Sequence, residues 1–183
     1  MAQPEPVAVC YWLTGLSAAG KTTLARQFHQ RLCEQGIAAY VLDGDEVRLG
    51  LNADLGFSRA DRAENTRRLG EVARLMADAG LVVIVAAISP YRDDRAKVSQ
   101  RFAPDCFVEV FVDADLDTCA RRDPKGLYRR ARAAELGNLT GVNDPYEAPE
   151  HPALHINSMT DAVAHNADRL LAWHDGLTGR SRS

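Results

Sequence analysis

The feature that most constrains this chain is a glycine-rich stretch near its start, Gly15-Leu16-Ser17-Ala18-Ala19-Gly20-Lys21-Thr22. Its two outer glycines are separated by four residues, and lysine and threonine follow the second one directly. The residues before it, 7–13, are apolar and β-prone, as in a buried strand. The residues after it repeat apolar side chains at helical spacing as far as Gly36. The stretch is therefore predicted to join a strand to a helix.

A loop of this composition between a strand and a helix suits phosphate binding. Glycines let successive backbone N–H groups turn toward anionic oxygens, and the helix N-terminus adds partial positive charge. Lys21 can reach the β- and γ-phosphates of a nucleotide, and the Thr22 hydroxyl can bind Mg²⁺. A chance glycine-rich turn is the alternative, but it does not explain why strand, loop, Lys-Thr pair and helix occur together. The residues expected at the nucleotide are Gly15, Leu16, Ser17, Ala18, Ala19, Gly20, Lys21, Thr22 and Thr23.

Size and charge limit what else the chain can be. Its 183 residues, 46% of them hydrophobic, suffice for one α/β domain with a proper core. We place that domain at 1–175 and expect 176–183 to be a disordered tail. A net charge of −3 argues against a general nucleic-acid surface. The longest apolar run, 81–88, is too short to span a membrane.

The cysteines and the N-terminal residues favour a cytoplasmic protein. Cys10, Cys33, Cys106 and Cys119 show no close pairing, as expected for free thiols in a reducing compartment. Their spacing does not favour a zinc site. The start of the chain is polar and acidic and does not resemble a signal peptide.

Segments that suit strands alternate with segments of helical spacing along the whole chain. The expected strands are 7–14, 38–42, 81–88, 107–112 and 154–157. The expected helices are 21–35, 47–51, 58–79, 91–102, 113–122 and 161–173, the third of them capped by Ser58 with Asp61 in its first turn. This alternation predicts an α/β fold, a P-loop NTPase-type parallel sheet of about five strands with helices on both faces.

Three groups of polar residues follow strands, at the edge where open parallel sheets bind ligands. They are the glycine-rich stretch, Asp43-Gly44-Asp45, and Ser89 to Arg92. One carboxylate can bind Mg²⁺, and the other can accept the proton of an attacking hydroxyl. An Asp-Gly-Asp surface turn is the alternative. The neighbouring phosphate loop favours a chemical role, with Asp43 near the metal and Asp45 at the hydroxyl.

Three polar residues beyond the second strand can together bind an anionic acceptor. Arg62 and Asn65 are three positions apart and so share a helix face. Arg48 can add a further positive charge, and Phe57 can stack on a base. The alternative for each of them is a solvated charged face, with Phe57 anchored in the core.

Two later features leave more than one interpretation open. Ser89 ends a buried strand, where its hydroxyl can bind substrate, accept a phosphoryl group as a nucleophile, or cap the next helix. The basic run from Lys125 to Arg132 can form a mobile lid that excludes water and stabilises transferring charge. Its alternative is a solvated helix face.

These stretches resemble the adenylylsulfate kinase (APS kinase) family. The resemblance covers about residues 10 to 155, and it rests on the blocks 15–23, 42–45, 50–52, 54–58, 61–65, 88–92 and 122–128. The phosphate loop alone is shared by many families. The blocks Ile-Ser-Pro-Tyr-Arg (88–92) and Lys-Gly-Leu-Tyr (125–128) are far more specific.

The resemblance implies an ATP- and Mg²⁺-dependent reaction. The γ-phosphoryl of ATP would pass to the 3′-hydroxyl of adenosine 5′-phosphosulfate and give 3′-phosphoadenosine 5′-phosphosulfate. The residues implied in catalysis are Lys21, Asp45, Ser89 and Lys125, with Thr22 and Asp43 at the metal. The residues implied at the acceptor are Asp45, Arg48, Phe57, Arg62, Asn65, Ile88, Ser89, Lys125 and Leu139. The resemblance also suggests a homodimer and a sulfurylase as a partner.

Ser89 matches the position that the family describes as a phosphoserine intermediate. In-line transfer to a positioned hydroxyl needs no such covalent step, so we expect Ser89 to contact substrate without being phosphorylated.

Three positions depart from the family pattern. Glu46 replaces an asparagine, Leu49 replaces a histidine, and Leu139 replaces a phenylalanine that would offer a second aromatic face to the adenine. Glu46 and Leu139 keep open a kinase of the same fold with a different small-molecule acceptor. The other alternative is a nucleotide-sensing switch, but the sequence lacks the Asn/Thr-Lys-x-Asp motif of switch GTPases.

Overall fold

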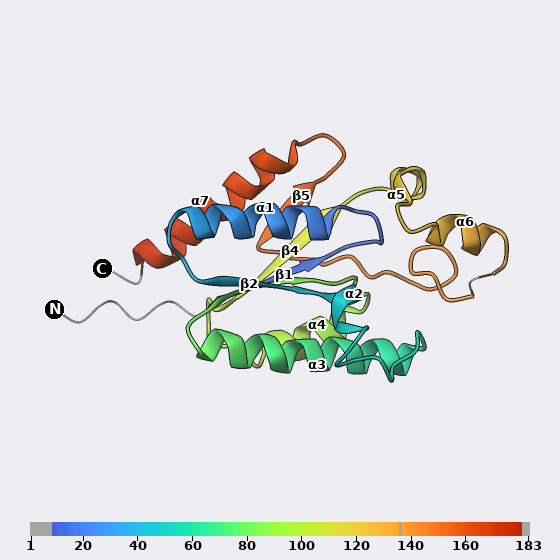
Figure 1. Cartoon of the computed structure of the whole chain (residues 1–183), viewed down its shortest axis with the longest axis horizontal. Coiled ribbons are helices and arrows are strands. Elements are labelled where there is room, and N and C mark those ends of the chain that lie inside the picture. The colour runs from blue at the N-terminus through green and yellow to red at the C-terminus, as the bar shows by residue number, and fades with distance from the viewer. Residues whose placement is uncertain (1–8, 136, 181–183) are drawn as a thin grey trace.

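A computed structural model describes residues 9–135 and 137–180. Its centre is a five-stranded parallel sheet in the order β2-β3-β1-β4-β5 (Figure 1). The strands are β1 (Cys10–Thr14), β2 (Ala39–Asp43), β3 (Val82–Ala86), β4 (Phe107–Asp113) and β5 (Leu154–Asn157). The expected parallel sheet is therefore confirmed.

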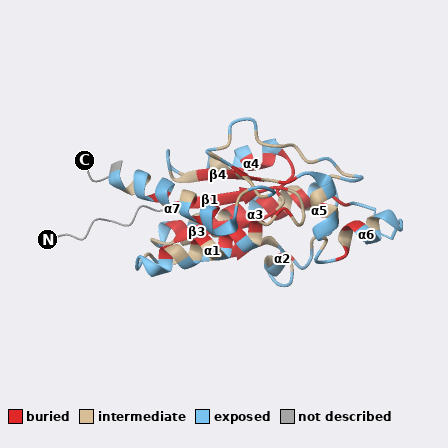
Figure 2. Ribbon diagram, turned by 90° about the horizontal axis from the view of Figure 1, so that it is seen from above, coloured by how far each residue is buried: buried red, intermediate tan, exposed pale blue. Residues whose placement is uncertain are grey.

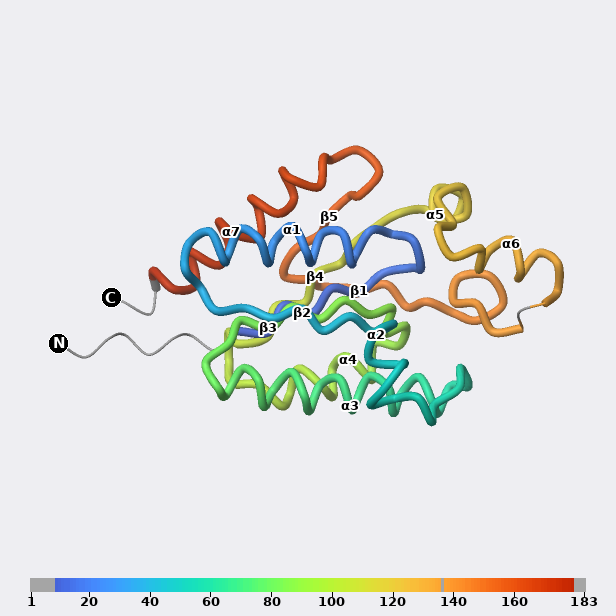
Figure 3. The backbone as a smooth tube through the Cα atoms, in the orientation of Figure 1, coloured from blue at the N-terminus to red at the C-terminus, as the bar shows by residue number. Residues whose placement is uncertain are grey.

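Helices cover both faces of this sheet, as the alternation of elements predicted. They are α1 (Lys21–Glu34), α2 (Gly44–Val47), α3 (Arg59–Asp78), α4 (Arg92–Ser99), α5 (Leu116–Arg122), α6 (Leu127–Arg132) and α7 (Val163–Arg180). Figure 1 shows α1 and α7 on one face and α3 and α4 on the other. Figure 3 shows α5 and α6 at one end of the molecule, with α2 closer to the sheet on the same side.

The two faces of the sheet bury separate apolar clusters. Along β1, Tyr11 and Leu13 face α1 and α7, whereas Cys10 and Trp12 face α3 and α4. All of β1 is buried, because it lies in the middle of the sheet and is covered on both sides (Figure 2). This is the burial that a continuous apolar strand predicts.

The start of α3 is fixed by a capping box. The Ser58 side chain accepts a hydrogen bond from the Asp61 backbone N–H, and the Asp61 side chain accepts one from the Ser58 backbone. The expected cap at Ser58 is confirmed. Along this helix, Leu69 and Ala73 are fully buried, whereas Leu75 is 58% exposed.

The chain end differs from the expectation. Helix α7 continues through Arg180, past the expected end of the domain at 175, because Leu171 and Leu177 pack against the core cluster under α1. The expected disordered tail is thus helical over 176–180, and 181–183 lie outside the described residues. The short helix expected at 47–51 lies earlier, at Gly44–Val47. Within the described residues, none of the helices combines the length and the hydrophobicity that a bilayer crossing requires.

Candidate active site

A cavity of about 890 Å³ lies at the carboxyl ends of the strands. Its walls come from the phosphate loop, the ends of β2 and β3, the start of α3, and the segment around α5 and α6. The following predicted site residues line it: Ser17, Ala18, Ala19, Gly20, Lys21, Thr22, Thr23, Asp43, Asp45, Arg48, Phe57, Arg62, Asn65, Ile88, Ser89, Lys125 and Leu139. Gly15 and Leu16 do not line it and form the base of the loop. The predicted residues thus share one cavity at the sheet edge where the parallel-sheet rule expects a ligand.

The phosphate loop needs its first glycine for steric reasons. A Cβ atom at Gly15 would lie 2.3 Å from the carbonyl oxygen of Val112 on β4, so no other residue fits there without moving the strand. Gly20 precedes α1 with a φ of 101°, in the left-handed region that favours glycine. These two positions let the loop curl tightly into the helix N-terminus, where anions bind.

Lys21 is buried at the start of α1 and folds back over the loop. Its Nζ donates hydrogen bonds to the carbonyl oxygens of Gly15, at 2.9 Å, and Leu16, at 2.6 Å. Burial lowers the pKa of Lys21 to about 8, and the negative charge of Asp45 opposes this shift. Because burial disfavours the charged form of Lys21, replacing its two carbonyl partners by phosphate oxygens costs the ammonium little stabilisation.

The next residue links the loop to the end of β2. The Thr22 hydroxyl donates to Oδ2 of Asp43 at 2.7 Å, and Oδ1 of Asp43 accepts from the backbone N–H of Asp45 at 2.9 Å. These are hard oxygen donors of the kind that Mg²⁺ prefers. Among the described residues there is no cluster of three or more His, Cys, Asp or Glu side chains that would hold a metal ion. The pair therefore suits Mg²⁺ that is held chiefly by nucleotide phosphates and water.

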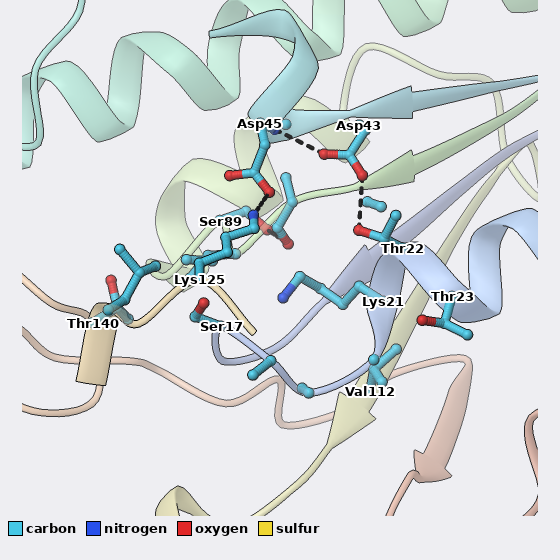
Figure 4. A pocket seen from close by; sticks show the side chains of 18 of the residues that line it. Ser17, Lys21, Thr22, Thr23, Asp43, Asp45, Ser89, Val112, Lys125 and Thr140 are labelled. Atoms are coloured by element: carbon cyan, nitrogen blue, oxygen red, sulfur yellow. Dashed lines mark hydrogen bonds and ion pairs between the residues drawn. The ribbon is translucent and has the colours of Figure 1, made fainter. Parts of the chain in front are cut away.

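Asp45 extends from the first turn of α2 into the cavity and forms an ion pair with Lys125 (Figure 4). Lys125 lies in the turn before α6, so the pair joins the basic segment to the end of β2. Both side chains remain more than half exposed, which leaves them accessible to a ligand. Of the two interpretations of the basic run, the structure favours a lid, because its one lysine faces the cavity.

Two further residues fasten this lid to the phosphate loop, and the sequence did not reveal either contact. The Tyr128 hydroxyl donates to the Ser17 carbonyl at 2.9 Å. Arg122 donates to the Ser158 carbonyl at 2.7 Å and to the Ala18 carbonyl at 3.5 Å. Tyr128 is 2% exposed, so α6 is partly buried and is not simply a solvated helix.

The residues proposed for the acceptor are held on the opposite wall. Arg62 is buried, and it donates to the Phe57 carbonyl at 3.0 Å and pairs with Asp144 at 3.0 Å. Asn65 is also buried, and its Oδ1 accepts from Asn52 at 3.0 Å. The solvated-face alternative is therefore wrong for Arg62 and Asn65. Asp144, which the sequence analysis did not single out, balances the charge of Arg62.

Phe57 offers an open aromatic face to the cavity. It is 52% exposed, so the alternative of a core anchor is wrong. The Arg48 guanidinium lies 4.6 Å from the ring centroid, within cation–π range. Leu139 lines the same cavity and is 4% exposed, and its backbone N–H donates to Oδ1 of Asn143 at 2.7 Å.

Ser89 lies just beyond β3 with a φ of 39°, in the left-handed region. Its Oγ accepts a hydrogen bond of 2.9 Å from the indole nitrogen of Trp12. The residue that caps α4 is Tyr91, and no side chain makes a cap hydrogen bond there. The capping alternative for Ser89 is therefore wrong, and Ser89 lines the cavity.

The fold and the site together define a class of protein. A phosphate loop with a buried lysine, a carboxylate pair at the end of strand β2, and a basic lid over the same cavity form a P-loop kinase. The family model described as adenylylsulphate kinase matches residues 7–157. The chain belongs to this family, and the expected family membership and enzyme class are confirmed.

Individual relatives support this family membership. An adenylyl-sulfate kinase of Geotalea daltonii is 52% identical over 162 residues, which cover 88% of this chain and 80% of the relative. The bifunctional enzyme NodQ of Rhizobium sp. (strain N33) is 53% identical over 163 residues, which cover 89% of this chain but only 25% of that enzyme. Among solved structures, the Mycobacterium tuberculosis APS kinase CysC in complex with AMPPNP and APS superposes with a TM-score of 0.88. It is 48% identical, and the match covers 91% of this chain and 97% of that one.

Proposed function

We propose that this chain transfers the γ-phosphoryl group of ATP to the 3′-hydroxyl of adenosine 5′-phosphosulfate and releases 3′-phosphoadenosine 5′-phosphosulfate. One observation carries the proposal. A single cavity places the phosphate-loop lysine, Lys21, and the Asp45–Lys125 pair around the same space. A donor phosphate and an acceptor hydroxyl can therefore meet there. The structural relative described as bound to both AMPPNP and APS supports this choice of substrates.

The donor half of the cavity holds ATP. The backbone N–H groups of 15–22 and the N-terminus of α1 bind its phosphates, and Lys21 exchanges its carbonyl partners for β- and γ-oxygens. The Thr22 hydroxyl and the Asp43 carboxylate hold Mg²⁺, which neutralises charge on the phosphates when it is bound. Because the oxygens of Thr22 and Asp43 already lie in contact, the two side chains can both approach one Mg²⁺ ion.

The acceptor half orients the hydroxyl that is phosphorylated. Asp45 accepts a hydrogen bond from this hydroxyl and takes its proton as the new P–O bond forms and the bond from the γ-phosphorus to the departing ADP breaks. Lys125, released from Asp45 by the substrate, then lies where negative charge develops on the transferring group. Arg48, Arg62 and Asn65 bind the phosphosulfate end of the acceptor.

The adenine of the acceptor lies between Phe57 and Leu139. Phe57 presents a half-exposed ring, and Leu139 presents an apolar side chain from another wall of the same cavity. Ile88 adds apolar contact beside Ser89. Ser89 binds substrate and is not phosphorylated, because direct in-line transfer needs no covalent intermediate.

The departure at Glu46 weakens this assignment less than the sequence alone suggests. Glu46 pairs with Arg26 on α1 at 3.4 Å, so part of its charge is balanced at the cavity mouth.

The leucine at position 139 keeps a second candidate open, a kinase of this fold with another hydroxyl acceptor. A panel of nucleoside, sugar and nucleotide acceptors, each supplied with ATP and Mg²⁺, separates the two. We expect adenylylsulfate to give a kcat/KM at least tenfold above every other acceptor. A better acceptor elsewhere in the panel would overturn the assignment.

Assembly and location are further parts of the proposal. A homodimer would double the 20.0 kDa mass of one chain, which light scattering on the purified protein measures directly. The match to a bifunctional enzyme several times longer supports a sulfurylase as partner, and co-purification with one tests this. The four cysteines are free, which supports the cytoplasm as the location.

A further inference from the structure

We propose that Trp12 is a positioning residue that fixes the Ser89 hydroxyl so that its proton is donated to an oxygen of the acceptor nucleotide. The inference rests on the proposed function, because it assigns the direction of one hydrogen bond within that site. Trp12 itself does not line the cavity. It acts through Ser89, which does.

The indole reaches Ser89 from a neighbouring strand. Trp12 is in the centre of β1 and 0% exposed, and β1 pairs with β3, the strand that precedes Ser89. Its Nε1 lies 2.9 Å from Oγ of Ser89. Phe107 packs against the indole with ring centroids 5.9 Å apart, which restricts the orientation of Trp12. A buried indole N–H without a partner would be costly, so this contact is well defined.

The backbone of Ser89 is fixed from the other side. Its φ of 39° is unusual for a residue other than glycine, and such a conformation persists only where its surroundings enforce it. Arg95 donates to the Ser89 carbonyl at 2.7 Å. Arg95 is 2% exposed and is held by Oε1 of Glu109 at 2.6 Å and by the Glu147 carbonyl at 2.8 Å. Side chain and carbonyl of Ser89 are thus both anchored.

These contacts set the direction of the remaining hydrogen bond. An indole N–H is only a donor, so the Ser89 oxygen must accept from Trp12. The hydroxyl proton then needs another acceptor. The one hydrogen-bond acceptor within the described residues for this proton is the Ala87 carbonyl, at the long distance of 3.5 Å. Because Ser89 lines the cavity (Figure 4), this proton is available to a phosphate, sulfate or ribose oxygen of the acceptor.

A double-mutant cycle tests this coupling. Trp12→Phe removes the N–H and keeps a ring, Ser89→Ala removes the hydroxyl, and the double variant has both changes. We expect Trp12→Phe to raise the KM for adenylylsulfate about three- to tenfold, the range of one neutral hydrogen bond, with kcat and the KM for ATP within about twofold of the wild type. In the Ser89→Ala background, the same change should alter the KM for adenylylsulfate less than about 1.5-fold.

The controls separate packing from positioning. Met76→Ala removes packing from the same apolar cluster at a position that does not line the cavity, so it should lower the thermal midpoint and leave the KM for adenylylsulfate unchanged. If Trp12→Phe fails to fold, benzothienylalanine in its place, in a Trp173→Phe protein, keeps the ring shape and lacks the N–H. An equal rise in KM with and without the Ser89 hydroxyl would overturn the positioning role. A wild type that does not use adenylylsulfate at all would instead overturn the proposed function.

Discussion

The ammonium of Lys125 and the carboxylate of Asp45 form an ion pair that bridges the basic segment before α6 and the first turn of α2. Surface ion pairs of this exposure contribute little to stability, about 0–1 kcal/mol. The pair therefore matters mainly because it fixes the positions of two side chains. It joins the basic segment to the end of β2 across the cavity, and in the proposed function it keeps two charged groups beside the acceptor hydroxyl.

The first prediction concerns this lysine. Lys125→Met should lower kcat about 10²-fold, because one charge-stabilising donor is lost from the transition state. The thermal midpoint should change by less than about 2 °C, as expected for an exposed pair. Steady-state kinetics and thermal unfolding measure both. Lys97→Met, on α4 and away from the cavity, is the matched control and should keep full activity. A Lys125→Met enzyme within threefold of wild-type kcat would mean that the lid lysine does not act on the transferring group.

The second prediction follows from the burial of Lys21, which lowers its pKa to about 8. At pH 8.5 roughly three quarters of the free protein then has a neutral Lys21. ATP phosphates stabilise the ammonium and raise its pKa, so binding should take up as much as about 0.7 proton at pH 8.5 and little at pH 7. Calorimetric titration in two buffers of different ionisation enthalpy measures this uptake. Identical binding enthalpies in both buffers at pH 8.5 would contradict it.

The third prediction tests the adenine pocket at Leu139. Leu139→Phe supplies a second aromatic face opposite Phe57. Base–aromatic stacking is worth about 1–3 kcal/mol, and because leucine already provides part of that contact, we expect a gain of about 1 kcal/mol. Adenylylsulfate binding should tighten several-fold while ATP binding stays unchanged.

Titration of each nucleotide into wild type and variant, with ADP present for the acceptor, measures the effect. Val142→Phe, at an exposed position that does not line the cavity, is the control. Unchanged or weaker adenylylsulfate binding by Leu139→Phe would show that Leu139 does not face the adenine.

The fourth prediction concerns stability, through a buried contact between β1 and α7. The Tyr11 hydroxyl and Nδ1 of His174 are 3.1 Å apart, and burial lowers the pKa of His174, with the charge of Asp175 opposing the shift. The unfolded chain therefore binds a proton near pH 6.5 that the folded chain resists. Stability should be full above pH 6.5 and fall below it, by at most about 1.4 kcal/mol per pH unit.

Urea unfolding at pH 7.5 and pH 5.5 measures the change. His174→Gln, which can still accept from Tyr11, should lose part of the pH dependence. His151→Gln, in an exposed loop, should keep all of it. If both variants show the same pH dependence of stability, groups other than His174 cause the loss of stability at low pH.

Much of the fold was predictable because its signals are local. The apolar run of β3, the capping box at Ser58 and the glycine-rich loop each depend on residues close together in the sequence. The position of the site followed from the rule that parallel strands bring their carboxyl ends to one edge. That rule predicted that Lys21, Asp43 and Ser89 lie at one edge of the sheet, without any knowledge of side-chain contacts.

The contacts that were missed join residues distant in the sequence. Tyr128 and Ser17 are 111 positions apart, and Trp12 and Ser89 are 77 apart. A tryptophan inside an apolar strand reads simply as core, and Arg95 reads as part of a charged helix. The available signal was chemical: an indole N–H or a guanidinium that is buried requires a partner. Sequence alone does not say which residue that partner is.

The most direct test of the account is the product formed from ATP, Mg²⁺ and adenylylsulfate by the purified wild type and by Lys21→Ala, separated by ion-exchange chromatography. The wild type should form 3′-phosphoadenosine 5′-phosphosulfate and ADP in equal amounts. Lys21→Ala should retain less than about 1% of kcat with an unchanged thermal midpoint, since the loss of such a contact lowers kcat about 10²–10³-fold. ADP formed without the 3′-phosphorylated product, or a Lys21→Ala enzyme with more than about a tenth of wild-type kcat, would contradict the account.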